Sequence, residues 1–241
     1  MMFKTECVAM RWVAVFDLLG TTQLLHDDSE WQVHDALARA IERARRDCKG
    51  DTSLVRPAWF SDTFILFTPD DSMQSYAMLD TIATNFFLGL ILDHIPARGA
   101  LACGRAYIDL EESVIFGRGL VEAYRFGDAQ DWIGFIVCPS AVALLSPHGL
   151  PSGLDYVQSD VPWSANRRPA GAPPQLPVFV IGRSGSLNGE NPFIGNLHRM
   201  SSEAAAGPQR AKYDRTLAFI EQHDTLIVPT DGATPWRARR Q

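Results

Sequence analysis

The stretch Arg11-Trp12-Val13-Ala14-Val15-Phe16-Asp17-Leu18-Leu19-Gly20-Thr21-Thr22 decides the fold. Residues 12–16 are all apolar, and the run ends at Asp17, which predicts a buried strand with a carboxylate at its end. Gly20 stands at the centre of a turn over residues 18–22. A buried carboxylate is costly unless it is paired or binds a cation, so Asp17 is a candidate for chemistry.

A second acid interrupts a second apolar stretch, Trp59-Phe60-Ser61-Asp62-Thr63-Phe64-Ile65-Leu66-Phe67. The pattern predicts antiparallel strands over residues 54–59 and 63–68, joined by a turn that contains Asp62. Two acids on neighbouring strands suit a two-metal phosphoryl-transfer site. Spacing alone leaves the alternative open that both acids are ordinary strand-end residues that cap loops.

Strands and helices mix along the rest of the first 145 residues. Ser29 can cap a helix that runs to about Cys48, and residues 69–72 begin a second helix over 73–93. The further expected elements are a hairpin of strands 98–109 and 113–116, a helix 117–129, a strand 133–138 and a short helix 139–145. This order predicts an α+β fold, a ferredoxin-like sheet with helices on one face.

The C-terminal part is more irregular in composition. Residues 162–177 and the Gly/Ser/Asn-rich residues 184–208 are expected to be loops, the second long and partly mobile. Between them we expect an edge-type strand over 177–182, and after them a terminal helix over 211–222. We therefore expect a catalytic domain over residues 1–183, with residues 184–241 as a loop and C-terminal helix packed on the same domain.

Composition excludes several classes of protein. The formal net charge is -6 and no basic stripe runs along the chain, so duplex nucleic acid is not an expected partner. None of the four cysteines forms a CxxC pair, which argues against zinc. No secretory signal is present, and the longest apolar stretch, 82–92, is too short to span a bilayer. We expect a cytoplasmic protein without membrane insertion.

Four segments in one order resemble class III nucleotidyl cyclases, and within them the pyrimidine cyclases of bacterial Pycsar antiphage systems. Residues 15–22 approximate the family pattern Phe-x-Asp-hydrophobic-x-Gly-Phe-Thr, and Ser61-Asp62 matches its Gly-Asp metal hairpin with Ser in place of Gly. Residues 98–104 resemble its Arg-hydrophobic-Gly strand, and residues 117–126 resemble its Gly-x-x-Val-Asn-x-Ala-x-Arg-Leu helix. The resemblance implies the class III cyclase fold.

The resemblance also implies a metal site. Asp17 and Asp62 would bridge two divalent ions, Mn²⁺ or Mg²⁺, with the Leu18 carbonyl as a further ligand. The backbone N–H groups of Leu19, Gly20, Thr21 and Thr22 would cradle phosphates. Phe16 would pack under the nucleotide, or else belong to the core.

Other implied roles fall on the helix after residue 117 and on a later loop. Arg125 corresponds to the arginine that steadies the α-phosphate, although an exposed helix arginine in a salt bridge is an equal alternative. Arg167 and Arg168 lie where the family keeps a triphosphate-binding lysine. Trp59 and Tyr124 would stack on or flank a pyrimidine, or else pack in the core.

Departures from the family pattern bear on the base. Purine cyclases keep a Lys and an Asp where this chain has Ala58 and Val114, and a ribose-orienting Asn where it has Val121. The expected reaction is therefore UTP to 3′,5′-cyclic UMP and pyrophosphate, with Arg105, Arg118 or Tyr124 reading the uracil edge. CTP is the next substrate, then ATP or GTP. A catalytically silent nucleotide-binding domain is the alternative from another class.

The resemblance finally implies partners. The chain would form a homodimer with its active sites at the interface. The cyclic nucleotide would act as a second messenger in antiphage defence and activate a separate downstream effector.

Overall fold

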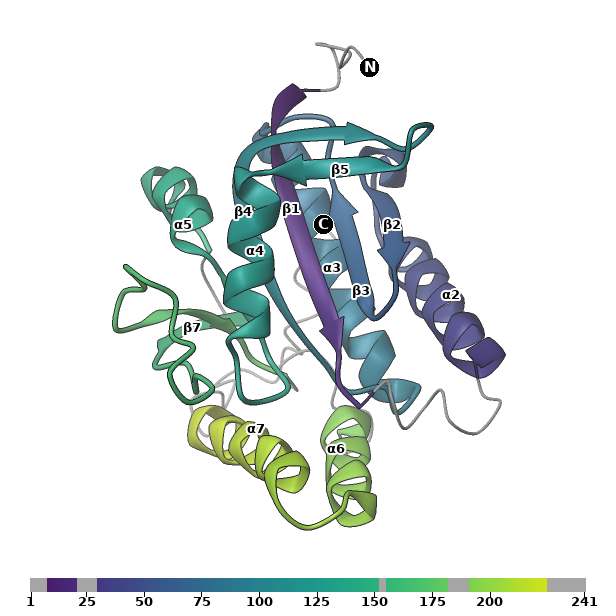
Figure 1. The fold of residues 1–241 in the computed structure, drawn as a ribbon, viewed down its shortest axis with the longest axis vertical. Helices are drawn as coiled ribbons and strands as arrows, with labels where there is room; N and C mark the ends of the chain where they lie inside the picture. The colour runs from purple at the N-terminus through teal and green to yellow at the C-terminus, as the bar shows by residue number, and fades with distance from the viewer. Residues whose placement is uncertain (1–7, 21–29, 152–154, 182–190, 225–241) are drawn as a thin grey trace, which may run out of the picture.

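One mixed sheet organises the chain. A computed structural model describes residues 8–20, 30–151, 155–181 and 191–224. The eight-stranded sheet has the order β2-β3-β1-β4-β6-β8-β7, and β5 pairs with β4 outside this path (Figure 1). The strands are β1 (Val8–Leu18), β2 (Arg56–Phe60), β3 (Thr63–Phe67), β4 (Ala97–Asp109), β5 (Val114–Gly117), β6 (Phe135–Val137), β7 (Tyr156–Ser159) and β8 (Leu176–Phe179).

Helices cover both faces of this sheet. They are α2 (Glu30–Arg46), α3 (Met73–Leu92), α4 (Arg118–Asp128), α5 (Pro139–Leu145), α6 (Pro192–Glu203) and α7 (Pro208–Asp224), with short 3₁₀ turns at Thr52–Leu54 and Ser146–His148. The expected α+β class and the expected first ten elements are confirmed. The strand and helix bounds differ from the expected ones by a few residues at each end.

The alternation along β1 sorts its side chains onto the two faces. Trp12 meets Tyr76 of α3 with ring centroids 5.1 Å apart, and Phe16 meets Phe86 of α3 at 5.2 Å. Asp17, the next residue, therefore points to the opposite face. Because β1 lies between β3 and β4, its residues 12–16 are buried and form the centre of the core, whereas Val8 and Met10 at its start are exposed.

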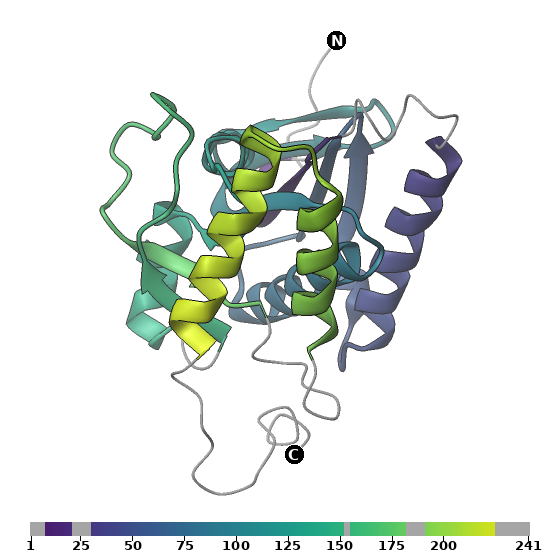
Figure 2. The same ribbon diagram turned by 90° about the horizontal axis from the view of Figure 1, so that it is seen from below.

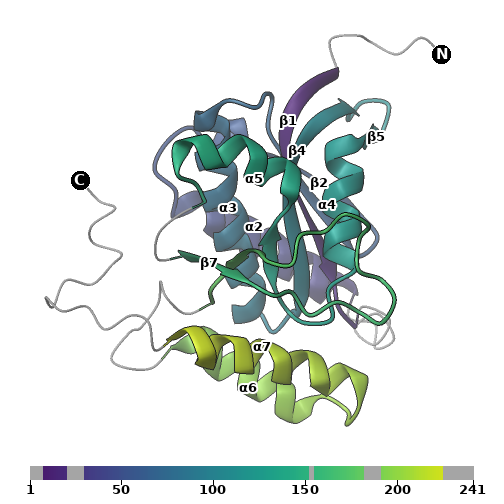
Figure 3. The same cartoon turned by 90° about the vertical axis from the view of Figure 1, so that its left-hand side faces the viewer.

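Helix α4 lies on the face that Asp17 shares. A Cβ added to Gly104 of β4 would stand 2.7 Å from the backbone nitrogen of Gly119 in α4, so only glycine permits this approach. Figures 1 and 3 show α4 on one side of the sheet and α2 and α3 on the other. The expectation that helices cover one face therefore holds for α2 and α3 and is wrong for α4.

Helix α3 is the longest and most apolar helix. Its length and hydropathy would allow it to cross a membrane, yet 72% of its most apolar window is buried within the protein. Ser72 caps its first turn by accepting a hydrogen bond from the Ser75 N–H, as the sequence predicts. Packing between α2 and the sheet accounts for its apolar surface.

The C-terminal part differs most from the secondary structure that the sequence predicts. Residues 184–208 were expected to be a loop, but they include α6, whose cap Asn191 accepts hydrogen bonds from the N–H groups of Phe193 and Ile194. Strand β8 is not an edge strand, because β7, which the sequence did not predict, pairs outside it.

Helices α6 and α7 form an antiparallel pair below the sheet (Figures 2 and 3). The Thr216 hydroxyl of α7 donates to the Ile133 carbonyl at 3.0 Å and accepts from the Ile133 N–H at 2.9 Å. Lys212 pairs with Asp131 at 2.6 Å. These contacts fix α7 on the segment that follows α4. A domain boundary at residue 183 stays a prediction, since residues 182–190 lie outside the described part.

Candidate functional site

The two acids that the sequence singles out meet at one end of the sheet. In the antiparallel pairing of β1 with β3, Asp17 stands opposite Thr63, the residue after Asp62. The Leu18 N–H donates to the Asp62 carbonyl at 3.0 Å, which closes the β2–β3 turn onto the end of β1. The structure thus brings together Asp17, Leu18 and Asp62, the three expected metal-binding residues.

Two turns of unusual backbone conformation surround these acids. Ser61 has φ 55° and Gly20 has φ 75°, both in the left-handed region. The Trp59 indole N–H donates to the Ser61 carbonyl at 2.6 Å and holds the hairpin turn. The Leu19 N–H donates to the Pro96 carbonyl at 2.8 Å, so the first N–H of the expected phosphate cradle already has a partner and the expectation for Leu19 is wrong. Thr21 and Thr22, the rest of that cradle, lie outside the described residues.

The left-handed backbone conformation of Ser61 should cost stability. An L-residue in the left-handed region costs roughly 1–2 kcal/mol, partly offset by the greater freedom of glycine in the unfolded chain. We expect Ser61→Gly to raise the free energy of unfolding by about 0.5–1 kcal/mol, or Tm by about 1–4 °C. Ser113, with φ 56° in the β4–β5 turn, is the matched control, and Ser113→Gly should stabilise similarly. Denaturant or thermal unfolding measures both, and a loss of stability in both variants would show that the turns are unstrained.

A buried arginine holds the first acid. Arg98 at the start of β4 contacts Oδ2 of Asp17 through Nε and Nη2, each at 2.7 Å. Its Nη2 also meets Oδ1 of Asp128 at 2.6 Å, and its Nη1 donates to the Gln130 carbonyl at 2.6 Å. Burial nevertheless raises the pKa of the Asp17 carboxyl, since it outweighs the Arg98 charge, and nearby Asp62 adds to the rise.

These groups fit a divalent cation. Among the described residues, Arg98 takes only Oδ2 of Asp17, so Oδ1 and the Asp62 carboxylate can ligate an ion together with the Leu18 carbonyl oxygen. Carboxylate and carbonyl oxygens are the ligands that Mg²⁺ and Mn²⁺ prefer. The described residues hold no group of three or more His, Cys, Asp or Glu side chains placed for a metal. Phosphate oxygens and water would therefore complete the coordination, as is usual for Mg²⁺.

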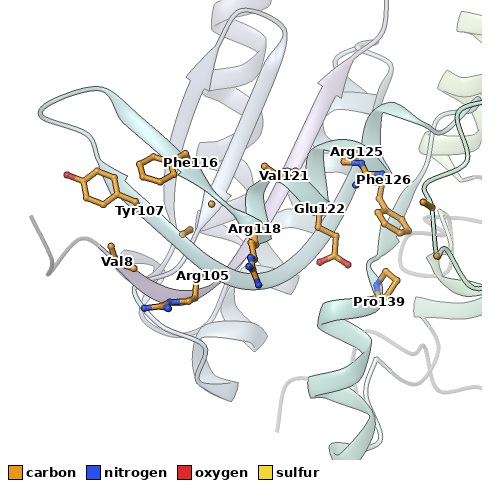
Figure 4. A pocket seen from close by; sticks show the side chains of 14 residues that line it. Val8, Arg105, Tyr107, Phe116, Arg118, Val121, Glu122, Arg125, Phe126 and Pro139 are labelled. Atoms are coloured by element: carbon orange, nitrogen blue, oxygen red, sulfur yellow. The ribbon is translucent and has the colours of Figure 1, made fainter. Parts of the chain in front are cut away.

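A cavity of about 870 Å³ lies along α4, between the β4–β5 hairpin and the start of α5. Figure 4 shows Arg105, Arg118 and Arg125 around it, with Phe116 as an aromatic wall. The one acid in the lining, Glu122, accepts a hydrogen bond from the Ser140 N–H at 3.1 Å. The cavity is therefore cationic and suited to an anion.

Arg125 has its guanidinium available in this cavity. Its side chain is exposed and forms no hydrogen bond or ion pair within the part of the chain that the structure describes. The salt-bridge alternative for Arg125 thus has no partner among those residues. This availability is what a phosphate-contacting arginine requires.

Two of the expected substrate-binding aromatics lie elsewhere. Phe16 is completely buried against α3 and belongs to the core. The expectation that it packs under a nucleotide is therefore wrong. Trp59 stands opposite Phe64 and stacks on His34 of α2 at 5.7 Å, which places it on the α2–α3 face. Tyr124 is exposed on α4, on the other face. Within one chain the structure therefore does not bring Trp59 and Tyr124 together.

Arg167 and Arg168, in the loop between β7 and β8, have different partners. Arg167 pairs with Asp128 at 3.1 Å and so joins the Asp17–Arg98–Asp128 chain of charges. Arg168 instead donates to the Ala172 and Pro173 carbonyls of its own loop. Of these two arginines, only Arg167 is linked to Asp17, through Asp128 and Arg98.

Sequence reasoning missed two groups of residues at this site. Phe60 is 80% exposed on the α4 face of β2, where the alternation with Trp59 places it. Arg98 contacts both Asp17 and Asp128, and of these two missed residues only Arg98 is conspicuous in the sequence, as a charge inside the apolar run of β4. Asp128 at the end of a helix had no such mark.

The fold is that of class III nucleotide cyclase domains. The catalytic core of a rhodopsin-guanylyl cyclase with converted specificity, in complex with ATPαS, matches with a TM-score of 0.53 and 12% identity over 72% of this chain and 97% of that one. An adenylate/guanylate cyclase/hydrolase from Silicibacter pomeroyi matches with 0.50 and 12% over 72% and 97%. The adenylyl cyclase CyaB from P. aeruginosa matches with 0.47 and 13% over 71% and 93%. No family model and no curated protein matches the sequence.

Proposed function

We propose that this chain is a nucleotidyl cyclase, which converts a nucleoside triphosphate to a 3′,5′-cyclic monophosphate and pyrophosphate. The observation that carries the proposal is the meeting of Asp17 and Asp62 at one end of a class III cyclase sheet. The likeness in fold to adenylyl and guanylyl cyclases supports the same reaction class. A cationic cavity with an available Arg125 adds a group for the phosphates.

Each residue has a definite part in the proposed reaction. The ribose 3′-oxygen forms a bond to the α-phosphorus while the bond from that phosphorus to the leaving pyrophosphate oxygen breaks. Asp17, Asp62 and the Leu18 carbonyl would hold two divalent ions, Mn²⁺ or Mg²⁺, which would lower the pKa of the 3′-hydroxyl and neutralise the triphosphate. Arg125 would stabilise the negative charge at the α-phosphate, and the N–H groups of Gly20, Thr21 and Thr22 would orient the leaving group.

We further propose that the active site is shared between two copies of the chain. The lining of the cationic cavity comes from β1, β4, β5, α4, α5 and a later loop, and it includes neither Asp17 nor Asp62. One copy would supply the acids and its partner the cavity, and an isologous homodimer would contain two such sites. Phe60, Phe116 and Tyr124 are exposed aromatics on this side of the molecule, as expected for an interface.

The base is proposed to be uracil. Ala58 and Val114 leave no charged pair to read a purine, while Arg105 and Arg118 line the cavity with Phe116. A guanidinium donates hydrogen bonds to the O4 acceptor of uracil, whereas cytosine presents an amino donor at that position. With Trp59 on the other face, the exposed aromatics Phe116 and Tyr124 are the ones proposed to flank the ring.

The base preference is measured by initial rates with UTP, CTP, ATP and GTP at equal concentration in Mn²⁺. We expect UTP to react fastest, CTP next, and the purines about tenfold more slowly or less. The variants Arg105→Met and Arg118→Met identify the reader, because the one that contacts O4 should narrow the ratio of UTP to CTP rates. Faster cyclic CMP formation would contradict the choice of uracil, and a preference for ATP or GTP would contradict the pyrimidine proposal while leaving the cyclase intact.

The biological role is proposed to be second-messenger signalling in antiphage defence within the cytoplasm. The cyclic nucleotide would activate a separate effector, so the chain itself needs no contact with membrane or nucleic acid. Cells that carry the cyclase with its effector should survive phage infection, and cells with Asp62→Asn should not. Equal survival of the two kinds of cell would contradict the role in defence but would leave the proposed cyclase reaction unaffected.

A further inference from the structure

Arg98 differs from the other arginines of the described chain in how completely its guanidinium is held. Its side chain is 10% exposed, and three nitrogens contact Asp17, Asp128 and the Gln130 carbonyl at 2.6 to 2.7 Å. Asp17 belongs to β1 and Asp128 to the last turn of α4. One planar group thus joins the end of a central strand to the helix that carries Arg125.

This arrangement is poorly explained by stability alone. Taking a guanidinium and two carboxylates out of water is expensive, and buried ion pairs can often be replaced by apolar residues without loss of stability. The fork geometry of arginine, however, fixes the direction of each bound carboxylate. Both contacts to Asp17 go to Oδ2, which sets the plane of that carboxylate and leaves Oδ1 directed elsewhere.

We propose that Arg98 is a positioning residue, which fixes the Asp17 carboxylate for metal binding and ties it, through Asp128, to α4. The inference rests on the proposed function, in that Asp17 is taken as a metal ligand. Asp128 acts by holding Arg98, so its effect on the metal is indirect. Groups that orient a metal ligand commonly change metal affinity about 10–100-fold when they are removed.

The amide and alanine variants of Asp128 test whether its hydrogen bond with Arg98 is needed for metal binding at Asp17. Asp128→Asn keeps an Oδ1 that can accept the Arg98 hydrogen bond, whereas Asp128→Ala removes it. The matched control is Asp93→Ala, which deletes the carboxylate partner of another half-buried arginine, Arg43, at 3.4 Å. The readout is binding of Mn²⁺ alone to the full chain, followed by electron paramagnetic resonance of the free ion, with no nucleotide and no turnover.

We expect Asp128→Ala to weaken Mn²⁺ binding about tenfold or more, with Asp128→Asn and Asp93→Ala within about threefold of the unsubstituted protein. Arg98→Lys should behave like Asp128→Ala, because an ammonium cannot hold both carboxylates and the carbonyl in one plane. It also serves as the second test if Asp128→Ala does not fold.

Two results would overturn the inference, and they differ in what else they remove. If Asp17→Asn weakens Mn²⁺ binding but Asp128→Ala and Arg98→Lys do not, the positioning role is wrong and the metal site stands. If Asp17→Asn binds Mn²⁺ as tightly as the unsubstituted protein, Asp17 is not a ligand, and both the proposed function and this inference fail.

Discussion

Replacing either acid, in Asp17→Asn or Asp62→Asn, is expected to lower cyclic nucleotide formation by about 10³-fold or more. Loss of one ligand removes several kcal/mol of charge stabilisation from the transition state, and each 1.36 kcal/mol corresponds to a factor of ten. Because the two carboxylates are proposed to hold the same ions, the double variant should lose little more than either single variant. The measurement is kcat with the preferred triphosphate at saturating Mn²⁺.

Although Asp17→Asn is expected to abolish most activity, it is expected to raise the stability of the metal-free protein. Burial raises the pKa of Asp17 above its unfolded value, so its favourable contribution is present at low pH and is lost as the pH rises through the folded pKa. At neutral pH the ionised Asp17 therefore costs stability, and Asn removes that cost while it still accepts the Arg98 hydrogen bond. We expect a higher metal-free Tm for Asp17→Asn at pH 7 than for the unsubstituted protein, with the difference shrinking as the pH falls through the raised folded pKa and absent below the unfolded value of about 4.

Asp160→Asn is the control for both measurements, since Asp160 is an exposed carboxyl beyond β7. It should leave kcat and Tm unchanged. Near-normal turnover in Asp17→Asn or Asp62→Asn would contradict the two-metal assignment. A fall in the metal-free Tm of Asp17→Asn at pH 7 would show instead that the ion pair with Arg98 outweighs burial.

Two inactive variants mixed together are expected to recover activity. In a heterodimer of Asp17→Asn and Arg125→Ala, one composite site carries both defects and the other carries neither. Random exchange makes half of the dimers mixed, so activity should return to about a quarter of the unsubstituted level. The measurement is turnover after mixing at equal concentrations, with subunit exchange followed by fluorescence transfer between labelled chains.

Each variant alone should stay inactive across the same concentration range, which is the control for incomplete inactivation. Exchange without recovered turnover would mean that Asp17 and Arg125 act within one chain or that Arg125 takes no part. A strictly monomeric protein with full activity would contradict the shared site as well.

Much of the fold could be predicted because local patterns agree with the final packing. The apolar run before Asp17 becomes the central strand, and the run with a Ser72 cap becomes α3. The failures have identifiable causes. Helix α6 begins at Asn191-Pro192, a capping signal hidden in a Gly/Ser/Asn-rich segment, and β7 is too short to show a pattern. The face covered by α4 depends on the long-range contact between Gly104 and Gly119, which no local pattern reveals.

In the candidate site, too, residues marked by a local pattern could be predicted, whereas those that depend on long-range contacts could not. Asp17 and Asp62 could be found because an acid in an apolar strand is conspicuous, and their pairing follows from a short hairpin. The place of Trp59 beside His34 could not be predicted, since its orientation depends on the register with Phe64. Asp128 could not be found at all, because its role exists only through Arg98, 30 residues earlier in the chain.

Identification of the products that the chain forms from nucleoside triphosphates tests whether it is a nucleotidyl cyclase. The purified chain is incubated with Mn²⁺ and each of the four nucleoside triphosphates, with Asp62→Asn as the control, and the products are identified by mass spectrometry. We expect a 3′,5′-cyclic monophosphate, most of it cyclic UMP, with one pyrophosphate for each molecule formed and none of either from Asp62→Asn. A nucleoside diphosphate with free phosphate, or no product from any triphosphate, would contradict the cyclase assignment.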